Sequence, residues 1–245
     1  MYRKYVPFLL FLFFLYGCNG NKQEEKEDVS VFVDLPQLKA EGEITAVTLY
    51  SSTSYFQYKM QPMGYEYDLI NDFAKSQGLK LNIKVAENPA RLIEMLEAGE
   101  ADVVAYPIPI NNKLKQEVIY CGREDISSQV LIQRANKGDK LLTDVTQLID
   151  KNVYVKPNTK YSERLKNLDE ELGGGIHIQK VENDSIATED LIEMVSLGEI
   201  PYTISDDNTA RLNKTYYWNI NVDLKVSFPQ RSSWVVRKSS PDLAK

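Results

Sequence analysis

The stretch LKLNIKVAENPARLIEMLEAGEADVVA, residues 79–105, contains a complete strand–helix–strand pattern. Apolar and polar residues alternate over residues 79–85, which predicts a half-buried strand. Asn88 is a favoured helix cap, Pro89 suits the first helical position, and Gly99 ends the apolar helical stripe that follows. A short buried strand closes the stretch. This order predicts strands that lie parallel in one sheet.

The same alternation of strands and helices extends in both directions. A strand over residues 44–50 and a helix over residues 67–77 come first, which is typical of an α/β layer. A second series follows, with helices over residues 145–149, 161–168 and 191–197, another helix from Asp207, and strands over residues 153–155, 176–181, 202–204, 223–226 and 233–237. We therefore predict two α/β lobes with a ligand cleft between them, the first formed by residues 43–127 and 225–245 and the second by residues 128–224.

The N-terminal residues predict export from the cytoplasm. Arg3 and Lys4 precede an uncharged, mostly apolar run over residues 5–17 that ends at Cys18. This run is too short to cross roughly 30 Å of hydrocarbon as a helix, so it predicts a signal peptide over residues 1–17. The residues just before Cys18 resemble the bacterial lipobox, which implies a cysteine that is lipidated and becomes the mature N-terminus. The alternative is an ordinary cleaved signal with an incidental cysteine.

Residues 18–42 are predicted to form a flexible tether, because the segment that follows Cys18 is polar, charged and poor in large apolar side chains. We interpret its acidic run as a solvated spacer, and an address for export to the cell surface is the alternative. Together with the lipid, the tether predicts a periplasm-facing or surface lipoprotein that is anchored in the outer membrane.

Composition excludes several classes of protein. The chain has 245 residues, of which 43% are hydrophobic and 26% charged, so it is a globular protein. Its net charge of −6 provides no overall attraction for nucleic acid. One histidine and two cysteines leave no zinc cluster or disulfide framework, and we expect His177 to be exposed on a strand and Cys121 to be buried. We predict no catalytic site, cofactor or metal within these residues.

Three short runs resemble family 3 of the bacterial extracellular solute-binding proteins. They are GYEYDL at residues 64–69, LEAGEADVV at residues 96–104 and LGEIPYTISD at residues 197–206. The resemblance covers residues 43–245 and implies a type II periplasmic-binding-protein-like fold, in which two lobes enclose a ligand. Within the family, the similarity to the N-terminal domain of membrane-bound lytic murein transglycosylases, which carry a lysozyme-like catalytic domain behind it, is seen at residues 153–157, 200–217 and 231–238.

The resemblance also implies how a ligand is held. Amino-acid-binding members of the family bind the ligand carboxylate with an arginine soon after the third strand. In this chain Leu114 stands at that position, and Tyr106 stands among the positions where the family has small hydroxyl residues. We therefore do not expect a standard site for a free α-amino acid. Asp206 matches the family aspartate that receives the ligand ammonium, and capping of the following helix is its alternative role.

Other candidate ligand contacts come from three loops. Lys156 and Thr159 lie in the ligand loop of the second lobe, where helix amides favour an anionic group; a solvated loop with a helix cap is the alternative. Ser51 and Tyr55 follow the first strand, where the family places an acid and an aromatic lid. Tyr65 and Tyr106 are expected to line an apolar or sugar-facing wall of the cleft, and packing is the alternative for each of these tyrosines.

These features predict a lipid-anchored solute-binding domain that is the sensor part of a peptidoglycan lytic transglycosylase. Its expected ligand is a small cell-wall peptide or an amino-acid-like molecule. Residues 240–242, Ser-Pro-Asp, are typical of a helix start, so we expect the natural chain to continue past Lys245 into a catalytic domain; a frayed polar tail is the alternative. One alternative is a free-standing receptor that delivers a small polar solute to an ABC importer. Another is a pair of lobes with a degenerate, empty cleft.

Overall fold

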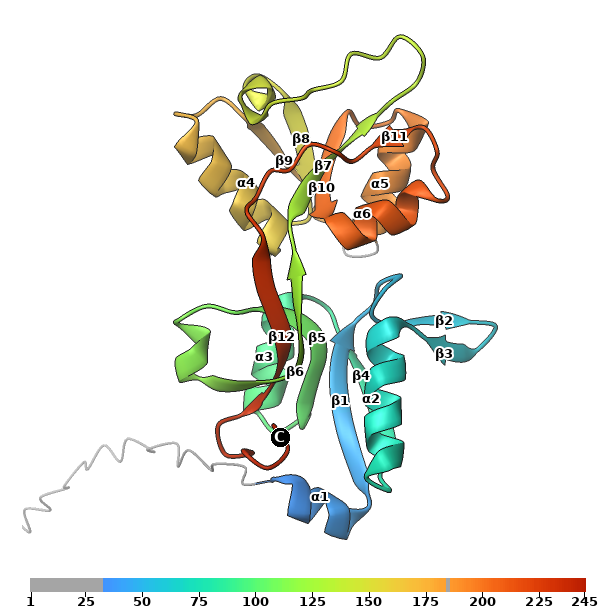
Figure 1. The fold of residues 1–245 in the computed structure, drawn as a ribbon, viewed down its shortest axis with the longest axis vertical. Helices are drawn as coiled ribbons and strands as arrows, with labels where there is room; N and C mark the ends of the chain where they lie inside the picture. Colours follow the sequence, from blue (N-terminus) through green and yellow to red (C-terminus); the bar gives the residue numbers. More distant parts are fainter. Residues whose placement is uncertain (1–32, 184–185) are drawn as a thin grey trace, which may run out of the picture. The chain divides into compact units, whose positions relative to one another are not determined.

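The computed structural model describes residues 33–183 and 186–245, which contain two five-stranded sheets (Figure 1). The predicted signal peptide, Cys18 and residues 18–32 of the predicted tether lie outside the described residues. None of the described helices is both long enough and apolar enough to span a membrane.

The first lobe is a sheet that is covered by a helix on each face (Figure 1). Its elements are β1 (Glu43–Leu49), α2 (Tyr65–Ser76), β4 (Lys80–Ala86), α3 (Pro89–Glu97), β5 (Val103–Pro109), β6 (Val118–Ser127) and β12 (Gln230–Arg237). The strand order is β4-β1-β5-β12-β6. As predicted, β1 is parallel to both β4 and β5, whereas β12 returns antiparallel between β5 and β6.

Alternation along the strands divides the core of the first lobe into two layers. Val103 packs with Ile70 of α2, and the next residue, Val104, packs with Leu92 of α3 on the opposite face. All these side chains are buried. Because successive side chains of a strand point to opposite faces, a strand buried on both sides reads as an unbroken apolar run.

The second lobe repeats this arrangement with a different strand order, β11-β7-β10-β8-β9. β8 is parallel to β9 and β10, and β7 is antiparallel to β10 and β11. Helix α4 packs on one face, and α5 and α6 pack on the other. The bounds are β7 Gln129–Arg134, 3₁₀ helix η2 Val145–Leu148, β8 Asn152–Val155, α4 Lys160–Glu171, β9 His177–Lys180, α5 Thr188–Leu197, β10 Tyr202–Asp206, α6 Asp207–Lys214 and β11 Ile220–Asn221.

One predicted strand and one predicted lobe boundary differ from the structure. Residues 223–226 do not form a strand, because the short edge strand lies earlier, at β11, and Lys225 makes only an isolated bridge to Val130. Val226 is buried in the core of the second lobe, so the predicted return to the first lobe at residue 225 comes too early. The sequence analysis also missed a hairpin of β2 (Phe56–Tyr58) and β3 (Gln61–Met63), whose turn carries no glycine.

Two chain segments cross between the lobes, and they lie side by side. The first passes from β6 to β7 through Ser128, and the second follows Val226 into β12. The amide N–H of Gln129 donates to the hydroxyl of Ser227 at 2.8 Å, and its side-chain amide donates to Gln230 at 3.3 Å. The amide of Val226 donates to the carbonyl of Gln129 at 2.9 Å. These bonds join both crossings into one two-stranded connection.

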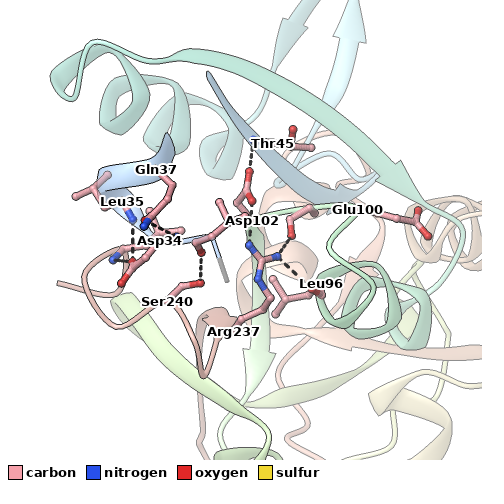
Figure 2. A network of polar contacts seen from close by, with 12 residues as sticks. Asp34, Leu35, Gln37, Thr45, Leu96, Glu100, Asp102, Arg237 and Ser240 are labelled. Carbon is pink, nitrogen blue, oxygen red and sulfur yellow. Dashed lines mark hydrogen bonds and ion pairs between the residues drawn. The ribbon is translucent and has the colours of Figure 1, made fainter. Parts of the chain in front are cut away.

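A buried ion pair holds β12 in the first sheet (Figure 2). Nη2 of Arg237 lies 3.0 Å from Oδ1 of Asp102, and the other carboxylate oxygen accepts the amide N–H of Thr45 at 2.9 Å. Nη1 of Arg237 donates to the carbonyl of Leu96 at 3.2 Å and to the carbonyl of Ala101. The network therefore ties the last strand to the first strand and to the end of α3.

Asp34 joins the beginning and the end of the described chain (Figure 2). It caps α1 (Leu35–Glu41), a helix in the region predicted to be tether; the prediction is wrong there, because Leu38 is buried against the first lobe. The same carboxylate accepts the amides of Asp242 at 3.0 Å and Leu243 at 2.8 Å. Residues 241–244 thus form a turn that is capped by Asp34, while the hydroxyl of Ser240, the predicted cap, donates to the carbonyl of Val33 at 2.6 Å.

Replacing Asp34 should destabilise the fold in a pH-dependent manner. Burial by itself raises the pKa of Asp34, but the N–H donors of Asp242, Leu35 and Leu243 outweigh it and hold the pKa below its usual value. Asp34→Ala should therefore lower the free energy of unfolding by about 1–3 kcal/mol at neutral pH, because buried donors lose their acceptor. The contribution is present above about pH 4 and is lost as the pH falls through the folded pKa.

Urea unfolding of both proteins at pH 7 and pH 3 measures this contribution. Asp242→Ala is the matched control, because it removes only the exposed carboxylate that pairs with Lys245. It should leave the unfolding midpoint nearly unchanged. A difference between wild type and Asp34→Ala that is the same at both pH values would contradict the prediction.

Candidate functional site

A pocket of about 670 Å³ opens between the two lobes. Both lobes contribute polar side chains to its walls, namely Tyr65, Arg123 and Asp125 from the first and Lys160, Asp206 and Asn208 from the second. The pocket continues along α2 to Trp234 and Leu243, where its walls are mostly apolar. Its size suits a small organic ligand, and its position between two α/β lobes is where such ligands bind.

Asp206 ends β10 and stands directly before α6. Its carboxylate makes no capping bond to that helix, so the capping alternative is wrong. Oδ2 of Asp206 instead lies 2.5 Å from Nζ of Lys160 and accepts the hydroxyl of Tyr161 at 3.1 Å. The side chains of this ion pair are only 22% and 20% exposed. The place where the family resemblance puts a ligand ammonium is therefore taken by an ammonium of the chain itself.

Two phenols near Asp206 are held in their protonated form. Burial raises the pKa of Tyr161 well above its ordinary value, and the negative charge of Asp206 raises it further. Burial likewise raises the pKa of Tyr106, with added contributions from the charges of Asp206, Glu189 and Glu66. Tyr106 also packs against the core layer under α3. Both hydroxyls are hydrogen-bond donors at neutral pH.

Two of the predicted contacts, Ser51 and Tyr55, serve the local turn after β1. The hydroxyl of Ser51 accepts the amide of Ser54 at 2.9 Å, and its own amide donates to the carbonyl of Tyr55 at 3.0 Å. The Tyr55 ring is buried and meets the ring of Tyr67 edge-on, with centroids 5.7 Å apart. Neither residue is among the described residues that line the pocket. A ligand contact of Ser51 or Tyr55, at the positions where the family places an acid and an aromatic lid, therefore stays a prediction.

The second-lobe loop is organised by helix capping. The hydroxyl of Thr159 accepts the amide of Ser162 at 3.3 Å and donates to the carbonyl of Lys156 at 2.8 Å. Nζ of Lys156 donates to the carbonyl of Asn183. Thr159 therefore caps α4, which agrees with the alternative of a solvated loop with a helix cap. Lys160, the first residue of α4, lines the pocket.

Strand β6 supplies pocket residues that the sequence analysis missed. Every second residue of its second half faces the pocket, beginning with Cys121 and continuing through Arg123, Asp125 and Ser127. Asp125 accepts the side-chain amide of Asn208 at 3.3 Å. An alternating pattern would have revealed this strand, but glycine and charged residues on both faces hide it.

The glycine before α2 sets the position of Tyr65 and Glu66. Gly64 has φ 135°, and a Cβ on it would lie 2.3 Å from the carbonyl oxygen of Ser54, so only glycine fits this close approach. Oε2 of Glu66 accepts the indole N–H of Trp234 at 2.6 Å. Burial raises the pKa of Glu66; the indole N–H lowers it in part, and the charge of Asp125 raises it again.

A polar contact between Ser52 and Glu189 joins the two lobes. The amide and hydroxyl of Ser52, in the turn after β1, donate to Oε1 of Glu189 on α5 at 3.0 and 2.9 Å. Ser52 is exposed and Glu189 is partly exposed, so water competes for this contact and it contributes little free energy.

Neither His177 nor Cys121 provides a reactive group for catalysis. His177 is exposed on β9, as predicted. Burial raises the pKa of Cys121 to about 12, which keeps its thiol unreactive at neutral pH. In the described part of the chain no group of three or more histidine, cysteine, aspartate or glutamate residues is placed to hold a metal ion.

Comparison with known proteins identifies the family. Residues 44–245 match the model for bacterial extracellular solute-binding proteins, family 3. The chain therefore belongs to this family. The arginine-bound form of a truncated ArgBP from T. maritima superimposes with a TM-score of 0.71 and 20% identity over 85% of this chain and 94% of that one. An ancestral amino acid-binding protein, described as a precursor of cyclohexadienyl dehydratase, superimposes with a TM-score of 0.69 and 20% sequence identity. This match covers 86% of this chain and 88% of the ancestral protein. The predicted two-lobed type II fold is confirmed.

Curated relatives narrow the relationship within the family. The chain is 31% identical over 211 residues to the membrane-bound lytic murein transglycosylase F of Desulfosudis oleivorans, which covers 84% of this chain and 44% of the relative. The protein of the same name from Pseudomonas fluorescens is 28% identical over 204 residues, which cover 82% of this chain and 41% of the relative. The chain is thus related to the N-terminal domain of these transglycosylases, and it spans less than half their length.

Asp206→Asn should lower the pKa of Tyr161, because the charge that disfavours the phenolate is removed while a hydrogen-bond acceptor remains. Alkaline titration of ¹³C-labelled tyrosine, with the signal assigned through Tyr161→Phe, measures this pKa. Asp125→Asn is the matched control, since Asp125 also lines the pocket but is not among the charges that act on Tyr161. An unchanged or higher pKa in Asp206→Asn would refute the arrangement.

Proposed function

We propose that this member of the extracellular solute-binding family 3 is the lipid-anchored sensor domain of a peptidoglycan lytic transglycosylase. In this proposal the interlobe pocket binds a small cell-wall peptide or an amino-acid-like molecule. Binding draws the lobes together and biases a catalytic domain that follows Lys245 in the natural protein. In this proposal residues 33–245 form a domain that binds the ligand and performs no catalysis itself.

The relationship to transglycosylase relatives carries this proposal. Identity of 31% extends over 84% of the chain, so it covers both lobes and not a single motif. The relatives named as transglycosylases are more than twice as long as the matched segment, which leaves room in them for a separate catalytic domain. A binding domain that accompanies a wall-cutting enzyme has an evident ligand class in the fragments of that wall.

The chemistry of the pocket supports a ligand other than a standard free amino acid. Leu114, at the family's arginine position, is half-buried in the 3₁₀ helix η1 (Leu114–Gln116) and packs with the core under α3. Asp206, at the ammonium position, is already paired with Lys160. A peptide offers further backbone donors and acceptors, so it can bind tightly where both main contacts of an amino acid are altered.

Lipidation of Cys18 and a flexible tether over residues 18–32 complete the proposal. A single acyl chain binds membranes only marginally, whereas two or more give stable anchoring. Anchoring in the outer membrane would hold the pocket on the periplasmic side or at the cell surface. The first described residues, Val33 and Leu35, pack on the first lobe.

A ligand of the proposed class should stabilise the purified chain. At one hundred times its dissociation constant it raises the free energy of unfolding by about 2.7 kcal/mol. For a chain of this size that corresponds to a rise in Tm of about 5–10 °C. Thermal unfolding with muropeptides, with free amino acids and with buffer alone measures the effect. If no compound raises Tm, the empty-cleft alternative is favoured.

Asp206→Ala provides an internal probe in the same titration. Loss of the ligand-induced rise in Tm, with the basal Tm little changed, would support a ligand contact at Asp206. A lower basal Tm with an intact ligand response would assign Asp206 a structural role with Lys160 instead.

The natural gene is expected to continue past codon 245 into a lysozyme-like domain with a catalytic glutamate. Sequencing the locus measures this directly. A stop codon within the length of one helix would overturn the transglycosylase assignment and favour the receptor of an ABC importer for a small polar solute.

A further inference from the structure

We propose that Arg123 is the receptor for a ligand carboxylate in the interlobe pocket. It takes over the charge that the family's arginine supplies elsewhere, and it identifies the ligand as a molecule with a free carboxylate. The inference rests on the proposed binding function and adds the chemical group that the pocket selects.

Arg123 differs from every other arginine in the described part of the chain. Six of the seven arginines there form ion pairs with carboxylates, with N–O distances between 2.5 and 3.1 Å; they are Arg91, Arg134, Arg164, Arg211, Arg231 and Arg237. Arg123 has no such partner among these residues, although Glu124 and Asp125 are its neighbours in sequence. Its side chain is positioned without having its charge neutralised.

The position of Arg123 is set by β6 and Tyr65. Alternation along β6 turns Arg123 toward the pocket, together with Asp125. Nη1 of Arg123 donates to the hydroxyl of Tyr65 at 3.2 Å. A guanidinium has five N–H donors in a rigid fork, so the remaining donors are available for a bidentate carboxylate. The tyrosine contact holds the fork at the pocket wall.

Other charges in the pocket wall are already engaged. Lys160 pairs with Asp206, and Lys245 pairs with Asp242. Among the described residues that line the pocket, Arg123 is therefore the cation that lacks a carboxylate partner. A ligand carboxylate can bind to it without breaking an existing ion pair, which it cannot do at Lys160.

The surrounding acids favour a monoanion over a dianion. Asp125 lies two residues beyond Arg123 on β6, Glu66 follows Tyr65 directly in α2, and both acidic side chains line the same pocket. Their negative charges oppose a phosphate dianion more strongly than a single carboxylate. The geometry thus favours a carboxylate, such as that of a peptide C-terminus or an amino acid.

The first test needs no knowledge of the natural ligand. Sodium acetate is titrated into the ¹⁵N-labelled chain against sodium chloride at equal ionic strength, and the arginine side-chain signals are followed by NMR. Arg123→Gln assigns the signal. We expect a saturable shift at Arg123 and only a small linear one at Arg231, an exposed arginine whose fork is already filled by Glu124. Equal responses, or a linear response at Arg123, would overturn the proposal.

The second test uses the peptide L-alanyl-γ-D-glutamyl-diaminopimelyl-D-alanine and the same peptide with all three of its carboxyl groups converted to amides, so that the amide form carries no carboxylate. Wild type should bind the acid roughly 10- to 100-fold more tightly than the amide, as expected for a charge-assisted contact. Arg123→Gln should abolish this ratio, and Arg123→Lys should keep part of it, because a lysine retains the charge without the fork. Arg231→Gln should leave the ratio unchanged.

The two tests separate this inference from the proposed function. A saturable acetate shift with no peptide binding would leave the carboxylate site standing and refute the cell-wall peptide. Peptide binding with equal affinity for acid and amide would refute the role of Arg123 and leave the binding function standing. A ratio that persists in Arg123→Gln would place the carboxylate elsewhere.

Discussion

The ion pair of Asp102 and Arg237 determines how the chain completes its first lobe. Four strands of the first sheet form before the chain leaves for the second lobe, and β12 must then insert between β5 and β6. Arg237 is 7% exposed, so removing either partner would leave a buried charge unpaired, at a cost of about 3–5 kcal/mol. Because Asp102 also accepts the amide of Thr45, the same carboxylate holds the first and last strands together. The double crossing, and with it the cleft, depends on that insertion.

The pocket that results is largely satisfied by the chain's own groups. Asp206 holds Lys160, Asp125 holds Asn208, and Glu66 holds the indole of Trp234. Such pairing fixes side chains in advance and reduces the ordering that a ligand must pay for. It also means that a ligand must either exchange an existing contact or use a group that is still free. At Asp206, for example, a ligand would have to exchange the existing contact with Lys160.

Sequence patterns predicted those helices and strands whose ends are determined by residues close to them in the sequence. Asn88 and Pro89 begin α3 where their types require it, and Gly198 ends α5 in the left-handed conformation. The pairing of Lys160 with Asp206 could not be predicted, because it joins distant residues and neither shows a distinctive pattern. Arg123 was missed because β6 carries charges on both faces. Asp34 was assigned to a tether because the amide N–H groups that donate to its carboxylate lie 208 and 209 residues away, at the other end of the chain.

The clasp formed by Asp34 has a mechanical consequence. Both ends of the described chain are fastened to the same lobe by one carboxylate, so a pull applied at either end is carried by the first lobe. The second lobe has its covalent connections through the paired crossing segments and lies outside this path, and it also contacts the first lobe through the hydrogen bonds of Glu189 with Ser52 and of Asn208 with Asp125. The separation of the two lobes is therefore set by the crossing segments and by these hydrogen bonds, and a force on the ends of the described chain would not act on it directly.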